Sequence, residues 1–267
     1  NIDDDVSKSY VEKIEKSIEF RQHGTPIRLI YDKDMPKDVL DIISAKFGFK
    51  TNQFVNGTGR YHLMKDLMNF PRVDPTLESK NPKPINSSRV KHNSSILESI
   101  REKDILLNYP YHTFHHFIQF LSEAAIDQKV ESIFITLYRT AERSKVLNAL
   151  INAAKNGKKV TVLIELMARF DEEQNMESVA LLQKEGVKIL LGIEGVKVHS
   201  KLVLVERRER SQTRGYVYVG TGNFNEKTAQ IYSDFGLFTA NPQVAEDARA
   251  VFDFLENTHR KFTCKQL

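Results

Sequence analysis

The sequence has little cysteine, no long apolar run and no strong excess of either charge. Its single cysteine, Cys264, cannot pair within the chain, which favours a reducing cytoplasm over a secreted, disulfide-rich class. No apolar run approaches the roughly 18–20 residues that a membrane-spanning helix needs. The acidic, polar start at Asn1–Asp5 does not resemble a signal peptide, and the net charge of +4 is too small to predict nucleic-acid binding. We therefore expect a cytoplasmic globular protein with no transmembrane segment and no nucleic-acid partner.

The residues up to about 85 predict a mixed α and β region. Apolar spacing predicts three helices, at Val11–Phe20, Pro36–Phe47 and Leu63–Phe70, and a strand at Pro26–Tyr31. Glycines predict a turn at Asn56–Gly59. Arg72–Lys91 is rich in proline and has few apolar residues, so it predicts an extended linker. We therefore expect two domains, 1–85 and 86–267.

The residues after 86 have a clearer rhythm. Buried-type strands are expected at Ser132–Leu137, Val160–Leu166 and Val187–Leu191, with helices between them. This order and spacing predict βαβ units, an α/β fold class and a mostly parallel sheet. The other expected elements are a helix at Thr113–Ile126, hairpin strands at Lys197–Glu206 and Gly215–Gly220, a strand at Phe235–Thr239 and a helix at Val244–Asn257.

His199 and Lys201 are the first candidates for chemistry. They stand two residues apart in a predicted strand, so their side chains should share one face. A neutral imidazole can attack phosphorus, and a neighbouring ammonium can neutralise the oxygens on which charge builds up. An H-x-K triplet alone more often comes from a surface strand that carries a histidine and a lysine by chance. It therefore predicts a phosphate site only together with other features.

A glycine-rich turn, Gly220–Asn225, follows the second hairpin strand. Glycines at a strand end let backbone N–H groups approach an anion closely. Asn223 can donate to a phosphate or orient the imidazole. The alternative is a plain glycine-rich turn.

Two arginines follow two neighbouring predicted strands. Arg139 comes after Ser132–Leu137, and Arg169 comes after Val160–Leu166. Ligands of parallel α/β sheets bind beyond the carboxyl ends of the strands, so this pair predicts an anion clamp. A surface salt bridge is the alternative for each arginine.

Three histidines, His112, His115 and His116, have helix-like spacing that resembles a metal site. No cysteine or acidic residue lies nearby in sequence to complete a zinc ligand set. We therefore expect these histidines to be solvated or packed.

Four motifs together resemble polyphosphate kinase, a branch of the phospholipase D superfamily. The H-x-K…G-x-x-N pattern at His199, Lys201, Gly220 and Asn223 is similar to a superfamily half-site. The closer resemblance, in family order and spacing, lies in Thr136–Arg139, Val162–Glu173, Val198–Leu202 and Gly220–Ala229. It covers essentially the whole chain. It implies that 1–85 is the later part of a head domain and that 86–267 is a first carboxy-terminal, phospholipase D-like α/β domain.

The resemblance also implies roles for single residues. His199 matches the phosphohistidine intermediate, and Tyr232 matches a nucleotide-contacting tyrosine. Arg139 and Arg169 match positions that line a magnesium–phosphate site. The superfamily pattern adds three candidates: catalytic Lys201 and Asn223, and nucleotide-binding Asn225.

The implied reaction is reversible transfer of the terminal phosphate of ATP to inorganic polyphosphate, with Mg²⁺ as cofactor. ATP, ADP and polyphosphate are then the partners, and we expect a homo-oligomer in the full-length enzyme. Two alternatives are a phosphodiesterase, in which water resolves the phosphohistidine, and a non-catalytic polyanion-binding module.

Two departures from the family pattern bear on this expectation. Glu206 stands where superfamily members often carry an aspartate, five residues after the H-x-K lysine. The family enzyme also has a domain on each side of the region matched here, and the chain starts without methionine. We therefore expect a fragment that is inactive alone.

Overall fold

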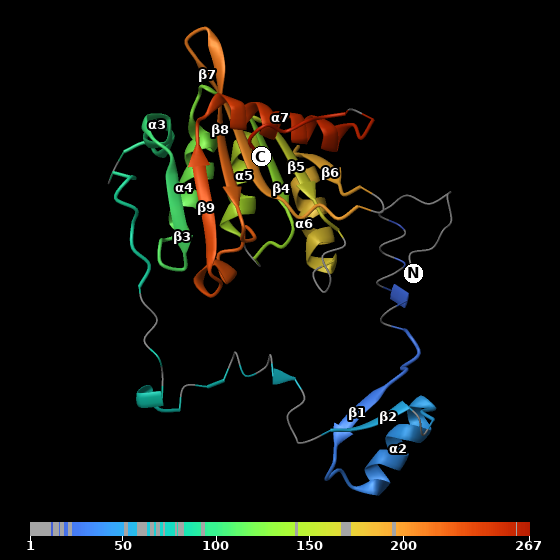
Figure 1. Cartoon of the computed structure of the whole chain (residues 1–267). Helices are drawn as coiled ribbons and strands as arrows, with labels where there is room; N and C mark the ends of the chain where they lie inside the picture. The colour runs from blue at the N-terminus through green and yellow to red at the C-terminus, as the bar shows by residue number, and fades with distance from the viewer. Residues whose placement is uncertain are drawn as a thin grey trace. The chain divides into compact units, whose positions relative to one another are not determined.

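A computed structural model describes most of the chain, which divides into two compact units, Asn1–Asn81 and Pro82–Leu267 (Figure 1). The described residues are 12, 16, 19–20, 23–50, 53–57, 63–64, 67, 70–71, 73–77, 79 and 83–267, without 92–93, 142–143, 167–171, 194–195 and 260. Arg169, most of the helix predicted at Val11–Phe20 and half of that predicted at Leu63–Phe70 lie outside these ranges.

The first unit has two parallel strands, β1 (Leu29–Asp32) and β2 (Phe54–Gly57), with α2 (Lys37–Phe47) between them. Helix α2 ends where Gly48 adopts a left-handed φ of 66°. Part of the predicted turn at Asn56–Gly59 is wrong, because Asn56 and Gly57 pair with β1 as the end of β2. A short 3₁₀ turn, η3, lies at Pro75–Leu77.

The second unit is built around a seven-stranded sheet in the order β3-β9-β8-β7-β4-β5-β6 (Figure 1). In chain order its strands are β3 (Ile105–Tyr109), β4 (Val130–Leu137), β5 (Lys159–Ile164), β6 (Lys188–Leu191), β7 (Lys201–Glu209), β8 (Gln212–Gly220) and β9 (Asp234–Thr239). Strands β4 and β5 read as nearly continuous apolar runs because both faces of the sheet are covered.

The α/β class is confirmed, but the mostly parallel sheet is wrong. Strands β4, β5 and β6 pair in parallel, as the βαβ spacing predicted. The other four pairings, β4 with β7, β7 with β8, β8 with β9 and β9 with β3, are antiparallel. The hairpin β7–β8 inserts beside β4 and reverses the direction at the centre of the sheet.

The helices of the second unit are α3 (Ile96–Glu102), α4 (His115–Ile126), α5 (Lys145–Lys155), α6 (Glu172–Lys184) and α7 (Pro242–Glu256), with a 3₁₀ turn η4 at Thr228–Gln230. Side-chain caps fix several starts. Ser144 accepts from the N–H groups of Val146 and Leu147, and Asn241 accepts from the N–H of Gln243. None of the described helices combines the length and apolar composition that a bilayer crossing would require.

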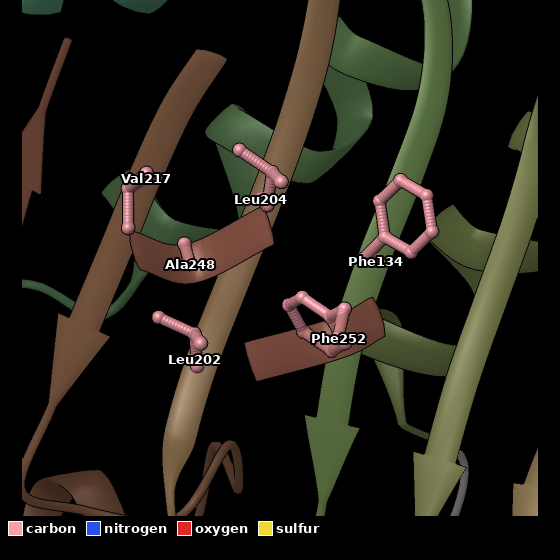
Figure 2. Close-up of a cluster of buried hydrophobic side chains, with 6 residues drawn as sticks. All are labelled: Phe134, Leu202, Leu204, Val217, Ala248 and Phe252. Carbon is pink, nitrogen blue, oxygen red and sulfur yellow. The ribbon is translucent and has the colours of Figure 1, made fainter. Parts of the chain in front are cut away.

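Helix α7 covers one face of the sheet over β4, β7 and β8 (Figure 2). The buried cluster there consists of Phe134, Leu202, Leu204, Val217, Ala248 and Phe252. The alternate strand residues point to the opposite face, where Phe117 of α4 contacts Tyr218 and Phe120 contacts Phe238. The sheet is therefore held between two helical layers, which fixes the edge where the candidate residues lie.

Three local differences from the sequence expectation matter for the site. Helix α3 and strand β3 were not predicted, and β3 pairs with β9 at the sheet edge. Strand β7 begins at Lys201 rather than at Lys197. The charged Arg207–Glu209 stretch belongs to β7, because Glu209 pairs with Gln212 across the hairpin.

Candidate active site

The candidate residues gather where five strands end at one edge of the sheet. Strands β4 and β5 reach this edge with their carboxyl ends, at Leu137 and Ile164. The antiparallel β7 starts there at Lys201, which pairs with Gly220 at the end of β8, and Gly220 pairs with Gly236 near the start of β9. Segments that are distant in sequence therefore place Arg139, His199, Lys201 and the Gly220–Asn225 turn along the same edge.

Tyr138 is the centre of this arrangement, and sequence reasoning missed it. The His199 ring meets the Tyr138 ring edge-on at a centroid distance of 4.8 Å. Lys197 Nζ and Lys201 Nζ lie 5.2 and 5.3 Å from the Tyr138 centroid, and Arg139 Cζ lies 5.6 Å from it. A tyrosine that directly follows a buried strand and precedes an arginine is the signal that could have found it.

The prediction that His199 and Lys201 lie in one strand is wrong, although their side chains meet the same Tyr138 ring. His199 lies in the extended segment before β7, while Lys201 is the first residue of that strand. Lys201 Nζ turns back and donates to the His199 carbonyl oxygen at 2.6 Å. The two residues are still neighbours, but through this contact and the shared Tyr138 ring rather than through strand pleating.

The surroundings shift both groups towards their neutral forms. Partial burial of the ring, and then the positive charges of Lys201, Lys197 and Arg139, lower the pKa of His199 below its usual value. Lys201 is only 6% exposed, and burial lowers its pKa to about 8, against the opposing charge of Asp234. At neutral pH the imidazole is therefore uncharged and nucleophilic beside cations that attract phosphate.

The glycine-rich turn is anchored by Phe224, which stacks on Phe117 at 4.6 Å. The Oδ1 atom of Asn223 is buried, and no described residue donates a hydrogen bond to it. Asp234 closes the turn by accepting from Thr221 Oγ1 at 2.7 Å, and a Cβ atom at Gly222 would meet its carboxylate at 2.4 Å. A side chain at 222 would force Asp234 to move, so the turn packs directly on the carboxylate whose charge acts on Lys201.

The two nucleotide-side candidates differ in their surroundings. The Asn225 side-chain oxygen accepts from the N–H groups of Lys227 and Thr228, so it holds the turn that leads into η4. Tyr232 follows η4 and is 56% exposed, as is its neighbour Ile231. Tyr232 thus presents an open aromatic face, whereas the Asn225 oxygen is already bonded within the protein.

Glu206 and the Arg207–Arg210 stretch lie far from His199. Glu206, at the superfamily aspartate position, bonds Ser132 Oγ and lies 3.1 Å from Arg249 Nη1. It stands five residues beyond Lys201 along β7, or about 17 Å at the usual strand rise. The Arg207–Arg210 stretch lies farther along the same hairpin, so it does not belong with the cations near His199.

His112, just before α4, and His116, in its first turn, accept backbone hydrogen bonds, whereas His115 is exposed. His112 Nδ1 accepts from the Asn108 N–H at 3.0 Å, and His116 Nε2 accepts from the Ser87 N–H at 3.1 Å. No group of three histidine, cysteine or acidic residues suited to a metal occurs in the described part of the chain. Among the described residues, the charged side chains that contact the Tyr138 ring beside His199 are all cations, so this set suits phosphate oxygens rather than a magnesium ion held by the protein.

Both parts of the chain match models of known protein families. The model of the polyphosphate kinase C-terminal domain 1 matches residues 95–261, and that of the polyphosphate kinase middle domain matches residues 1–70. The chain belongs to the polyphosphate kinase family. A curated polyphosphate kinase of Yersinia pestis is 40% identical over 98% of this chain, and that of Escherichia coli (strain K12) is 38% identical over 97%.

The crystal structure of the family member from Porphyromonas gingivalis matches 86% of this chain with 36% identity and a TM-score of 0.71. The chain spans 38% of the length of the Yersinia pestis and Escherichia coli relatives and 35% of the Porphyromonas gingivalis chain. A phospholipase D family member from Salmonella typhimurium matches 58% of this chain at 18% identity with a TM-score of 0.45, a likeness too weak to carry an inference.

Proposed function

We propose that this chain is part of a cytoplasmic, homo-oligomeric polyphosphate kinase in which His199 accepts and donates the phosphoryl group. The observation that carries the proposal is the His199 ring, with its lowered pKa, set against Tyr138 among Lys197, Lys201 and Arg139. A neutral nucleophile within a cationic group suits the attack on a charged phosphate.

The proposed reaction has two displacements. An imidazole nitrogen of His199 attacks the γ-phosphorus, a P–N bond forms, and the bond to the bridging oxygen breaks so that ADP leaves with its electron pair. A terminal oxygen of polyphosphate then attacks the same phosphorus, and the P–N bond returns its electrons to the imidazole. Lys201 and Arg139 offset the charge on the phosphoryl oxygens in both steps.

The remaining residues have proposed roles around this centre. Arg139 and Arg169 bind phosphate oxygens, and Mg²⁺ arrives with the nucleotide phosphates. Asn223 donates to a phosphoryl oxygen through its amide nitrogen, and Tyr232 stacks on the adenine through its exposed ring. Asn225 offers its amide nitrogen to a nucleotide, because its oxygen accepts from the N–H groups of Lys227 and Thr228.

The test is ATP-dependent polyphosphate synthesis by the longer protein that contains this chain, with ADP release measured in parallel. We expect both to be lost in His199→Ala and to be reduced but present in Asn225→Ala. Alcohol release from a phosphodiester without any need for ATP would instead support the phosphodiesterase alternative. Polyphosphate binding with no ADP release would support the non-catalytic module.

A further inference from the structure

The segment that carries His199 is held by side chains rather than by strand pairing. Residues 196–200 have no strand or helix assignment, and the ladder between β7 and β8 starts only at Lys201. A nucleophile on such a segment needs another source of rigidity, because misplacement by about 1 Å can cost on the order of 10²-fold in rate. The structure provides contacts on both sides of His199.

Glu165 makes the contact on the amino side. Its Oε2 atom accepts from the Val198 N–H at 2.9 Å, and the residue is 1% exposed. Its own backbone is fixed at the end of β5, where its N–H donates to the Leu137 carbonyl at 3.0 Å and its carbonyl accepts from Asn175 Nδ2 at 3.0 Å. The carboxylate therefore joins the end of the parallel sheet to the residue before His199.

Gly192, which has no side chain, lies against the Glu165 carboxylate and leaves room for it. A Cβ atom at Gly192 would lie 3.2 Å from Glu165 Oε2, tighter than ordinary packing. A buried carboxylate is costly unless hydrogen bonds satisfy it, and charge-assisted bonds to N–H groups are stronger than neutral ones. The position of this glutamate is thus defined by packing as well as by its hydrogen bond.

Thr136 makes the contact on the carboxyl side. This residue of β4 is 2% exposed, and its hydroxyl donates to the Ser200 carbonyl at 2.7 Å and accepts from the Leu202 N–H at 3.1 Å. Together with the bond from Lys201 Nζ to the His199 carbonyl, these contacts fix the backbone at 198, 199, 200 and 202.

We propose that Glu165 is a positioning residue that, with Thr136, clamps the backbone on either side of His199 and aims its imidazole at the phosphorus. Glu165 acts through the Val198 N–H and does not touch the substrate. The catalytic part of this inference rests on the proposed role of His199 as nucleophile. The clamp itself does not, so the two can fail separately.

The first experiment measures the clamp in this chain without any substrate. Amide hydrogen exchange at Val198 is followed by NMR in the wild type and in Glu165→Met, which keeps the side-chain length but removes the acceptor. We expect at least tenfold faster exchange at Val198 in the variant. Glu206→Met is the matched control, since Glu206 is a carboxylate of β7 remote from His199, and it should leave Val198 unchanged.

Two further variants keep this experiment decisive. Thr136→Val, which is nearly isosteric, should speed exchange at Leu202, and Glu165→Gln, which keeps an acceptor oxygen, should speed exchange at Val198 less than Glu165→Met does. If Glu165→Met does not fold, the glutamine and valine variants decide the outcome. Unchanged exchange at Val198 and Leu202 in folded variants would overturn the clamp, whatever the function of His199.

The second experiment measures the consequence in the longer protein. We expect kcat for His199 phosphorylation to fall on the order of 10²-fold in Glu165→Met, with KM for ATP little changed, and to recover partly in Glu165→Gln. Glu206→Met should lower thermal stability but leave kcat unchanged. An equal loss of kcat in both methionine variants would reduce Glu165 to a stabilising residue and overturn the positioning role.

Discussion

At the residue scale, Lys201 influences the site in two ways. Its charge is the second cause, after burial, of the lowered pKa of His199, and its own pKa is lowered to about 8. Protonation of His199 removes the nucleophile as the pH falls, and deprotonation of Lys201 removes a phosphate-binding charge as the pH rises. The rate of His199 phosphorylation should therefore be bell-shaped, with its acidic midpoint below the usual histidine value of about 6.5 and its alkaline midpoint near 8.

Lys201→Met should change both limbs of this profile. The acidic midpoint should move up towards the usual histidine value, because one of the charges that lower the pKa of His199 is gone, and the alkaline fall near 8 should disappear. The profile is measured as the initial rate of phosphohistidine formation. Lys158→Met is the control, since Lys158 binds the Asp127 carbonyl away from the site. A profile unchanged by Lys201→Met would contradict the electrostatic account.

At the element scale, α7 holds the centre of the sheet on which the site is built. Phe252 is fully buried and meets Phe134 of β4 at a centroid distance of 5.4 Å (Figure 2). Phe252→Ala should lower the free energy of unfolding by about 3–5 kcal/mol, because it removes a large buried side chain and leaves a cavity. Chemical denaturation measures this, and Glu246→Ala, on the exposed side of the same helix, should change stability by about 0.5 kcal/mol or less.

The elements also show how far the sequence could be interpreted. Apolar runs at Ser132–Leu137 and Val160–Leu166 predicted the parallel strands β4 and β5 because both faces of these strands are covered. The five-residue strand β3 was missed because so short a run carries little periodicity. The order of the strands in the sheet could not be predicted from the sequence either, since the placement of β7 beside β4 depends on pairing between distant segments.

The same limit applies to the candidate site. Residue types and spacing were enough to name His199 and Lys201 as candidates and to place Arg139 just after β4. The role of Tyr138 and the Glu165 contact to Val198 depend on side chains that meet only after the chain folds. The exact start of β7 was unpredictable because a β-like sequence continues on both sides of Lys201.

At the scale of the whole molecule, two basic residues, Lys197 and Arg208, lie towards opposite ends of β7. Lys197 lies by Tyr138, whereas Arg208 is near the hairpin end, seven residues beyond Lys201 or about 23 Å along the strand. We expect this chain to bind polyphosphate, with Lys197→Ala weakening binding several-fold and Arg208→Ala, with the same loss of charge, having little effect. Titration calorimetry measures both affinities.

Binding should also weaken as salt rises, because exposed charges are screened over about 8 Å at physiological ionic strength. Equal weakening by Lys197→Ala and Arg208→Ala would show that polyphosphate binds a diffuse surface and not the His199 edge. The chain spans only 38% of its curated relatives, so polyphosphate synthesis itself belongs to experiments on the longer protein.

The phosphorylation state of His199 tests the central claim most directly. The longer protein is incubated with ATP labelled in its γ-phosphate, and the labelled residue is mapped by peptide mass spectrometry under alkaline conditions that preserve phosphohistidine. We predict an acid-labile, base-stable label on His199 that is absent from His199→Ala and that polyphosphate removes. A label that persists in His199→Ala, or that maps to a serine or threonine, would contradict the account.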